Sequence, residues 1–181
     1  MIERIAKAAR PILYFPIIRR VRRNHALEHA TIHMLSRANR NLRMAGRSSD
    51  GGFVLIGNVA TDQVEKAADD ALRRLNSGES NLALHPNCGT NLVTAGALTT
   101  FVALIGMGSR SRPVTPDRLS WTMTMMILAL IVSQPLGMTL QKHITTEGDP
   151  GDLEIIGVTK REIPWPLGGT VTLHNVNTRR G

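Results

Sequence analysis

The sequence predicts an α+β membrane protein: a two-helix transmembrane hairpin with a small cytoplasmic α/β layer, formed jointly by the N-terminal half and the C-terminal strands. Three observations indicate this class. Two long stretches carry no charged residue, a β–α–β order precedes them, and two strand-like stretches follow them. The single cysteine excludes an internal disulfide framework, and the 42% apolar content excludes a collagen-like or wholly disordered chain.

The positive charge is concentrated at the N-terminus. The net charge is +8, yet residues 1–47 hold eleven Lys/Arg and only two acids. Four arginines at positions 19–23 follow the apolar stretch PILYFPII, which is too short to cross a bilayer. We expect residues 1–23 to form an in-plane amphipathic anchor whose basic side chains face anionic lipid headgroups. A frayed basic tail is the alternative. No nucleic-acid partner is expected, because the arm has no stacking platform or reading motif.

Residues 24–91 are expected to form a soluble α/β part. Asn24 is a suitable N-cap for a helix that ends near Asn39, and the turn formers AGRSSDGG then predict a loop. The stretch GFVLIGNV (residues 52–59) is mostly apolar and predicts a covered strand.

A second helix is predicted over residues 62–77, with Thr61 as its N-cap and Gly78 closing it. Its apolar stripe consists of Val64, Ala68, Ala71, Leu72 and Leu75. The stretch NLALH (residues 81–85) is a candidate for a short second strand.

Residues 92–141 are expected to form the transmembrane hairpin. LVTAGALTTFVALIGM (92–107) is marginal in length, whereas residues 119–141 can cross about 30 Å of hydrocarbon at about 1.5 Å per residue. We expect Gly96 and Thr100 to let the two helices approach closely. The alternative is a helical hairpin buried in a soluble protein.

An even number of spans puts both termini on one side of the cell membrane. The basic arm favours the cytoplasm for both ends of this multi-pass chain. Arg110, Arg112 and Arg118 in the short connecting loop argue for the opposite orientation, while a lone Cys88 suits a reducing compartment. We therefore expect cytoplasmic termini.

Residues 142–181 are expected to supply two strands that pack on the soluble part. DLEIIGVTKRE (152–162) and TVTLHNV (170–176) flank the loop PWPLGG. Because two strands cannot fold alone, we expect them to pair with the strand at 52–59.

The helix beginning at Asn24 carries the first chemical motif. His25 and His29 are four residues apart, so both project from one face and can share a metal ion. His33 follows on the same side, opposite an apolar stripe, as a spare ligand or a partner of one. Glu28 lies between the two faces, where it could orient a ligand or act on a metal-bound water. The alternative is a histidine face that is solvated or hydrogen-bonded to a neighbouring loop.

The second motif is His85-Pro86-Asn87-Cys88-Gly89. It places a histidine and a cysteine three residues apart in a tight turn directly before the first apolar segment. A structural turn with a buried thiol is the alternative. Together, His25, His29, His85 and Cys88 form a tetrahedral set of borderline-soft donors, which favours zinc, with iron next. His143 and His174 are assigned no role.

The paired motifs His-x-x-Glu-His-x-Thr and His-Pro-x-Cys-Gly-Thr-Asn resemble those of two bacterial membrane-protein families of unknown function. In both families the motifs precede hydrophobic helices, and one carries the label of a metal-dependent enzyme. The resemblance covers residues 23–146. The motif at His25, Glu28 and His29 is also similar to that of inverted zinc peptidases, which take a third ligand from a downstream glutamate. Here the candidates are His85 and Cys88.

Three functions remain open at this point. The first is a metal-dependent hydrolase of peptides or lipids that uses Glu28 as general base toward a metal-bound water. The second is a non-enzymatic membrane subunit or scaffold whose metal fastens the first helix to the 85–91 loop. The third is a peripheral adaptor whose basic arm binds lipids or acidic partners.

Overall fold

The computed structural model describes residues 2–108, 113–164 and 168–181. The chain forms two compact units, called here the sheet unit (residues 1–84 and 142–181) and the hairpin unit (residues 85–141). Arg110 and Arg112, on which one orientation argument depends, lie outside the described residues, as does the centre of the PWPLGG loop.

The sheet unit opens with three helices, α1 (Ile2–Ala8), α2 (Arg10–Leu13) and α3 (Pro16–Ala38). Helix α3 begins well before Asn24, so the expected N-cap at Asn24 is wrong. Pro16 occupies the first turn, where a missing N–H costs nothing, and no breaker follows it. Asn24 is instead fully buried: its amide donates to the Ser49 carbonyl at 2.9 Å, and its carbonyl accepts from the Thr178 hydroxyl at 2.8 Å.

Four antiparallel strands form the sheet, β1 (Ala45–Ser49), β2 (Gly52–Ile56), β3 (Glu154–Pro164) and β4 (Thr170–Arg179), in the order β1-β2-β4-β3. The expected return of the C-terminal strands is confirmed, since β4 pairs with β2 and β3 pairs with β4. The expected loop over residues 45–52 is wrong, because β1 pairs with β2 across a two-residue turn. The strand expected at 81–85 is also wrong, since η1 (Ser80–Ala83) is a 3-10 helix there.

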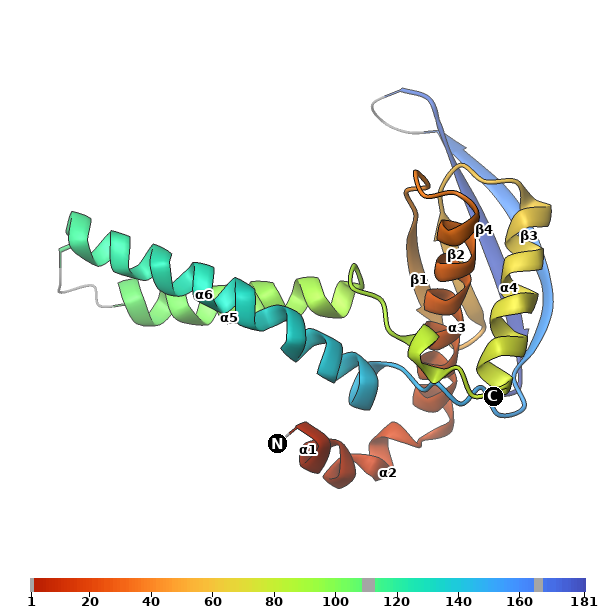
Figure 1. Cartoon of the computed structure of the whole chain (residues 1–181), viewed down its shortest axis with the longest axis horizontal. Coiled ribbons are helices and arrows are strands. Elements are labelled where there is room, and N and C mark those ends of the chain that lie inside the picture. Colours follow the sequence, from red (N-terminus) through yellow and green to blue (C-terminus); the bar gives the residue numbers. More distant parts are fainter. Residues whose placement is uncertain (1, 109–112, 165–167) are drawn as a thin grey trace. The chain divides into compact units, whose positions relative to one another are not determined.

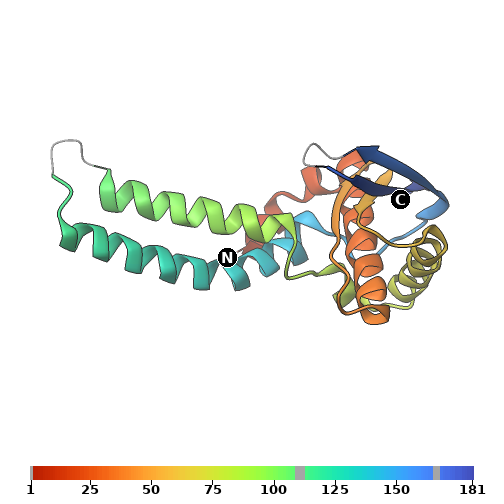
Figure 2. The ribbon, with the colours of Figure 1, turned by 90° about the horizontal axis from the view of Figure 1, so that it is seen from above.

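The core of the sheet unit lies between one face of the sheet and two helices, α3 and α4 (Thr61–Asn76) (Figures 1 and 2). Phe53 and Leu55 from β2 and Val176 from β4 pack there with the apolar side of α3, represented by Leu27. Four members of the predicted α4 stripe are buried and Leu72 is partly buried.

The sequence predicts the C-terminal end of α4 correctly but not its N-cap. Gly78 closes the helix with a φ of 95°, as expected. Thr61 does not cap it, because Ala60 is the N-cap and makes no side-chain cap. The Thr61 hydroxyl lies 3.3 Å from Nε2 of His174, a fully buried side chain of β4. Burial lowers the pKa of His174, with a smaller contribution from the charge of Lys160.

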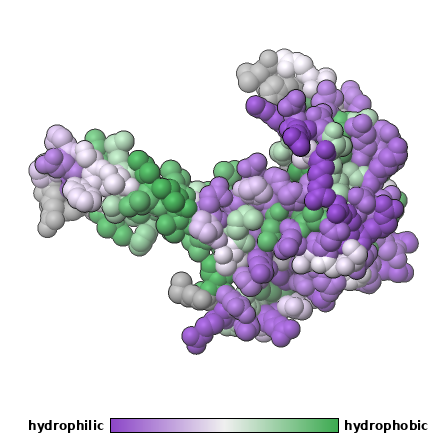
Figure 3. Space-filling view, viewed as in Figure 1, coloured by the Kyte–Doolittle hydropathy of each residue, from purple (hydrophilic) through white to green (hydrophobic). Residues whose placement is uncertain are grey.

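The hairpin unit consists of α5 (Gly89–Met107) and α6 (Pro116–Leu140), which run antiparallel (Figure 2). Helix α6 continues into a π-helical turn, η2 (Gln141–Thr145). Both helical segments, Gly89–Met107 and Pro116–Thr145, are long and apolar enough to cross a membrane. Large apolar side chains are exposed along both helices, including Leu104, Trp121 and Ile131 at 64–68% exposure, and green surface dominates the middle of the hairpin in Figure 3.

Glycines determine how closely α5 and α6 approach, although not the glycine expected from the sequence. Gly96 has no heavy atom near the position of a Cβ, and both Gly96 and Thr100 are exposed, so their expected role is wrong. The close contacts are at Gly106, against Thr122, and at Gly137, against the backbone and side chain of Asn91. Small residues at such crossings let helix backbones approach in lipid.

We expect Gly137→Ala to destabilise the hairpin by about 1–3 kcal/mol, because the added methyl overlaps Asn91. The matched control is Gly96→Ala, where the methyl meets open space. Thermal unfolding of both full-length variants in one detergent measures the difference. Equal unfolding temperatures for the two variants would contradict this packing.

Candidate metal centre

Helix α3 presents His25 and His29 one turn apart on the same face, as the spacing predicts. Their ring centroids are 4.4 Å apart and the rings meet edge to face. His29 is 2% exposed and His25 is half-buried. The expected histidine face is therefore not a solvated one.

Each histidine of this face bonds a backbone carbonyl from another segment. Nδ1 of His25 lies 3.0 Å from the Thr145 carbonyl oxygen, and Nδ1 of His29 lies 2.7 Å from that of Ala83. Nε2 of His33 lies 2.8 Å from the carbonyl oxygen of Leu84. These bonds match the alternative in which a neighbouring loop satisfies the histidines.

The same bonds also assign the protons. A carbonyl oxygen can only accept, so Nδ1 of His25 and Nδ1 of His29 are the donors. In a neutral imidazole, Nε2 then carries the lone pair. This is the usual state of a metal-ligating histidine, whose second ring nitrogen donates to a carbonyl or carboxylate. The two rings are thus compatible with metal binding through Nε2.

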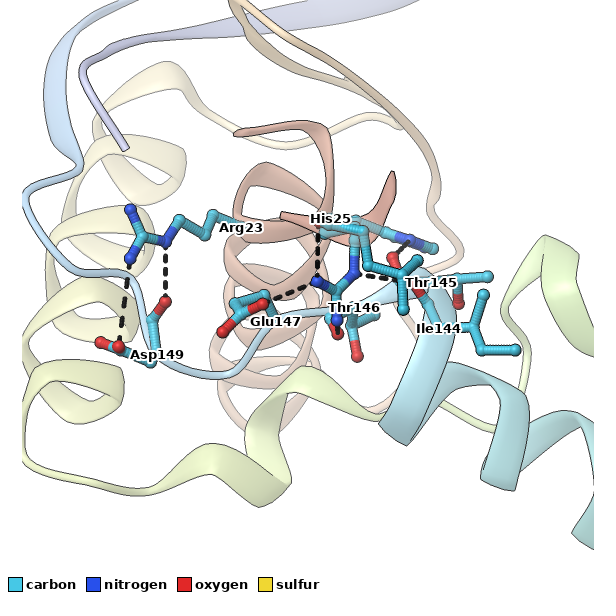
Figure 4. Close-up of polar contacts among 9 residues, drawn as sticks. Arg23, His25, Ile144, Thr145, Thr146, Glu147 and Asp149 are labelled. Atoms are coloured by element: carbon cyan, nitrogen blue, oxygen red, sulfur yellow. Dashed lines mark hydrogen bonds and ion pairs between the residues drawn. The ribbon is translucent and has the colours of Figure 1, made fainter. Parts of the chain in front are cut away.

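A buried guanidinium holds the segment that bonds His25, whose residues 144–147 are labelled in Figure 4. Arg22 donates to the carbonyls of Ile144 at 2.7 Å and Thr146 at 3.0 Å, on either side of Thr145. It also pairs with the Glu147 carboxylate at 2.7 Å. Arg22 therefore positions the carbonyl that faces His25.

Arg23 is buried as well, which corrects part of the anchor hypothesis. Its Nε donates to the Asp149 carbonyl at 3.1 Å, and its guanidinium lies within 4 Å of the carboxylates of Asp149 and Asp152. Arg22 and Arg23 are 7% and 5% exposed. The expectation that both face lipid headgroups is wrong, because these internal acceptors satisfy their charges.

The hairpin unit holds the second motif in a hydrogen-bonded turn. Cys88 is the N-cap of α5: its buried Sγ accepts from the Thr90 N–H at 3.4 Å. The side-chain amide of Gln141 makes two hydrogen bonds to the backbone of His85. Its oxygen accepts from the His85 N–H at 2.9 Å, and its nitrogen donates to the His85 carbonyl at 3.0 Å. Asn91 accepts from Gln141 and donates to the carbonyl of Pro86.

Sequence reasoning missed Gln141 and Asn91. Both are buried amides at the ends of otherwise apolar segments. A polar residue in that position is costly unless bonded, which is the signal that could have identified them.

The four predicted ligands come from two units. His25 and His29 belong to the sheet unit, whereas His85 and Cys88 belong to the hairpin unit. Nδ1 of His85 accepts from the Asn87 N–H at 3.2 Å, which leaves the proton of a neutral ring on Nε2.

Glu28, the predicted general base, faces strand β1. Its buried carboxylate accepts a hydrogen bond from the Ser48 hydroxyl. Gly46 leaves the space that the carboxylate fills, since a Cβ at this position would overlap it. Burial raises the pKa of Glu28, while the hydrogen bond from Ser48 and the charge of His25 oppose that shift.

Comparison with known proteins places the chain in a family. Residues 20–158 match the profile of DUF6391, a domain of unknown function. The chain belongs to the DUF6391 family. This confirms the resemblance to a family without an assigned reaction, and the matched region includes both motifs.

This DUF6391 protein is also similar to an uncharacterized protein of Picosynechococcus sp., with 35% identity over 136 residues. The aligned region covers 70% of this chain and 65% of the relative, so the chain spans about two thirds of the relative's length. No solved structure matches the chain.

We expect Gly46→Ala to destabilise the protein by about 1–3 kcal/mol, because the methyl displaces the buried carboxylate of Glu28 from Ser48. Gly157→Ala in β3 is the control, since nothing lies near its Cβ position. Thermal denaturation followed by circular dichroism measures both. A Gly46→Ala variant as stable as the control would show that this carboxylate is not held by β1.

Proposed function

We propose that this DUF6391 protein is an integral membrane protein that binds one transition-metal ion at the membrane surface, with zinc favoured and iron next. The observation that carries the proposal is the tautomer of His25 and His29. Two buried or half-buried rings, one turn apart, each donate Nδ1–H to a backbone carbonyl, which places the lone pair of a neutral ring on Nε2.

The proposed ligands are Nε2 of His25, Nε2 of His29 and Sγ of Cys88. Two imidazoles and a thiolate form a borderline-soft set that suits zinc in tetrahedral geometry. The N-cap position supports Cys88 as a ligand, because a helix N-terminus favours an atom that carries negative charge. The fourth position is assigned to water or to His85, whose ring would have to exchange its proton from Nε2 to Nδ1.

The membrane assignment follows from chain connectivity. Cys88 immediately precedes α5, and Thr145, which bonds His25, ends the other apolar helical segment. A metal held by these residues would lie at the level where the spans leave the hydrocarbon. We propose a multi-pass protein of the cell membrane with both termini in the cytoplasm, in accordance with the basic arm.

Hydrolysis of a peptide or lipid bond is the activity proposed for this site. With three protein ligands, a zinc ion lowers the pKa of its bound water to about 7. Burial raises the pKa of Glu28, which makes its carboxylate a stronger base than an exposed one and is compatible with this chemistry. The competing function is a structural metal in a non-enzymatic subunit, and the engagement of Glu28 by Ser48 favours it.

Metal content tests the proposed ligands. We expect the purified full-length protein to contain about one zinc per chain, and Cys88→Ser to lose most of it, because an alcohol is a far weaker zinc ligand than a thiolate. The serine oxygen can still cap α5, so the fold is expected to persist. Elemental analysis of wild type, Cys88→Ser, His25→Asn and the control His143→Asn measures this. Metal-free wild type, or equal metal in all four proteins, would refute the site.

Glu28→Gln separates the two roles of the metal. If the protein is a hydrolase, the variant retains its zinc and its fold but loses at least about 100-fold in rate, because the base is gone. Zinc-loaded wild type and variant are compared on peptide and phospholipid-ester substrates in vesicles. If the metal is structural, neither protein shows zinc-dependent hydrolysis, while chelation lowers the unfolding temperature of both.

A further inference from the structure

A polar cavity lies in the sheet unit, and none of the histidines that are proposed as ligands lines it. Its volume is about 390 Å³. Helices α1 and α2 form one side, and the segment around residues 142–148 forms the other. Its charged and aromatic lining consists of Glu3, Lys7, Arg10, Tyr14, Arg22, Lys142, His143 and Glu147.

The charges that line this cavity are not balanced. Glu147 is bound to Arg22 at 2.7 Å, and Glu3 is bound to Lys7 at 3.3 Å. Within the part of the chain that the structure describes, no carboxylate lies within ion-pair distance of Arg10 or Lys142. The cavity therefore presents two cations that internal acids do not neutralise.

The cation on α2 is held in place. The guanidinium of Arg10 lies 5.2 Å from the centroid of the Tyr14 ring, and the guanidinium of Arg19 lies 4.9 Å from it. Stacking on an aromatic ring orients a guanidinium while its N–H groups stay available. Arg22, by contrast, donates hydrogen bonds to the carbonyls of Leu13, Ile144 and Thr146, so these bonds hold its guanidinium in place at the edge of the cavity.

The chemistry of this cavity suits a phosphate group. Guanidinium and ammonium groups are the side chains that proteins use for phosphates, the former through paired N–H donors and the latter as a point charge. Two such cations and a tyrosine line the same cavity, so it offers several hydrogen-bond donors to a tetrahedral anion.

The place of the cavity in the chain points to a lipid as the source of the phosphate. Lys142 and His143 lie in the last turn of the apolar helical segment Pro116–Thr145, where a span reaches the headgroups. The arm that carries Arg10 also exposes large apolar side chains, Ile5, Ile12, Phe15 and Ile17, each more than half exposed. Such a surface fits acyl chains beside a headgroup.

We propose that this cavity binds the phosphate of an anionic phospholipid through Arg10 and Lys142. The proposal depends on the membrane insertion proposed above, and it is independent of the metal. The basic arm would then bind one lipid per chain at a defined site, in place of a diffuse electrostatic attraction to the membrane surface.

The test is a titration of the full-length protein in neutral detergent micelles, followed by native mass spectrometry. The probes are phosphatidylglycerol, phosphatidylcholine, sn-glycerol 3-phosphate and inorganic phosphate. We expect one tightly bound phosphatidylglycerol per chain. The double variant Arg10→Gln/Lys142→Gln is expected to bind it about 30-fold more weakly, since each basic residue near a lipid headgroup contributes about fivefold.

Two controls make the test specific. Arg40→Gln/Lys66→Gln removes the same charge from exposed positions outside the cavity and is expected to change the affinity less than about twofold. Lys142→Gln alone leaves the Arg10–Tyr14 stack intact and is expected to lose about fivefold. Circular dichroism confirms the fold of each variant.

Several outcomes would overturn the proposal. Equal losses in the two double variants would mean that lipid binding follows overall charge. Equal affinity for phosphatidylglycerol and phosphatidylcholine would exclude an anionic-lipid site. If either soluble phosphate bound as tightly as the lipid, with the same dependence on Arg10 and Lys142, the source would be a free phosphate. Zinc content and carbonate extraction of the same preparations report separately on the metal and on membrane insertion.

Discussion

The buried guanidinium of Arg22 is the interaction on which the sheet unit most depends. A charge removed from water is tolerated only when other acceptors replace the water, and here three carbonyls and one carboxylate accept hydrogen bonds from the guanidinium. These acceptors come from the end of α2 and from residues 144–147, so one side chain joins both to α3. The same bonds orient the Thr145 carbonyl toward His25, and Arg22 also lines the polar cavity that contains Arg10 and Lys142.

The candidate metal centre shows how backbone carbonyls select the chemistry of a histidine. His25 and His29 share a face because they are four residues apart, but their availability as ligands depends on which ring nitrogen holds the proton. Carbonyls from two distant segments determine this by accepting from Nδ1. His85 illustrates the opposite case, because a backbone N–H donates to its Nδ1.

The interactions that hold the two helices of the hairpin unit together differ from those of the sheet unit. In the membrane that we propose for this unit, apolar side chains gain little by contacting one another, so close backbone approach and buried hydrogen bonds would carry the association of the helices. Gly106 and Gly137 supply the close approach. Gln141 and Asn91 supply the hydrogen bonds, and they also hold the turn that contains Cys88. A polar cluster at the end of an apolar hairpin thus serves both stability and the proposed site.

The sequence by itself determined the elements whose pattern is local. The α4 stripe, the two apolar helices, the strand character of the two C-terminal stretches and the shared face of His25 and His29 all follow from periodicity, composition or spacing, which neighbouring residues encode. Only the tertiary structure decided the start of α3, the strand at 45–49, the burial of Arg22 and Arg23, and the glycines at the helix crossing. It also assigned the imidazole protons. Each of these depends on a partner distant in the chain, and no local pattern specifies which carbonyl, strand or side chain that partner will be.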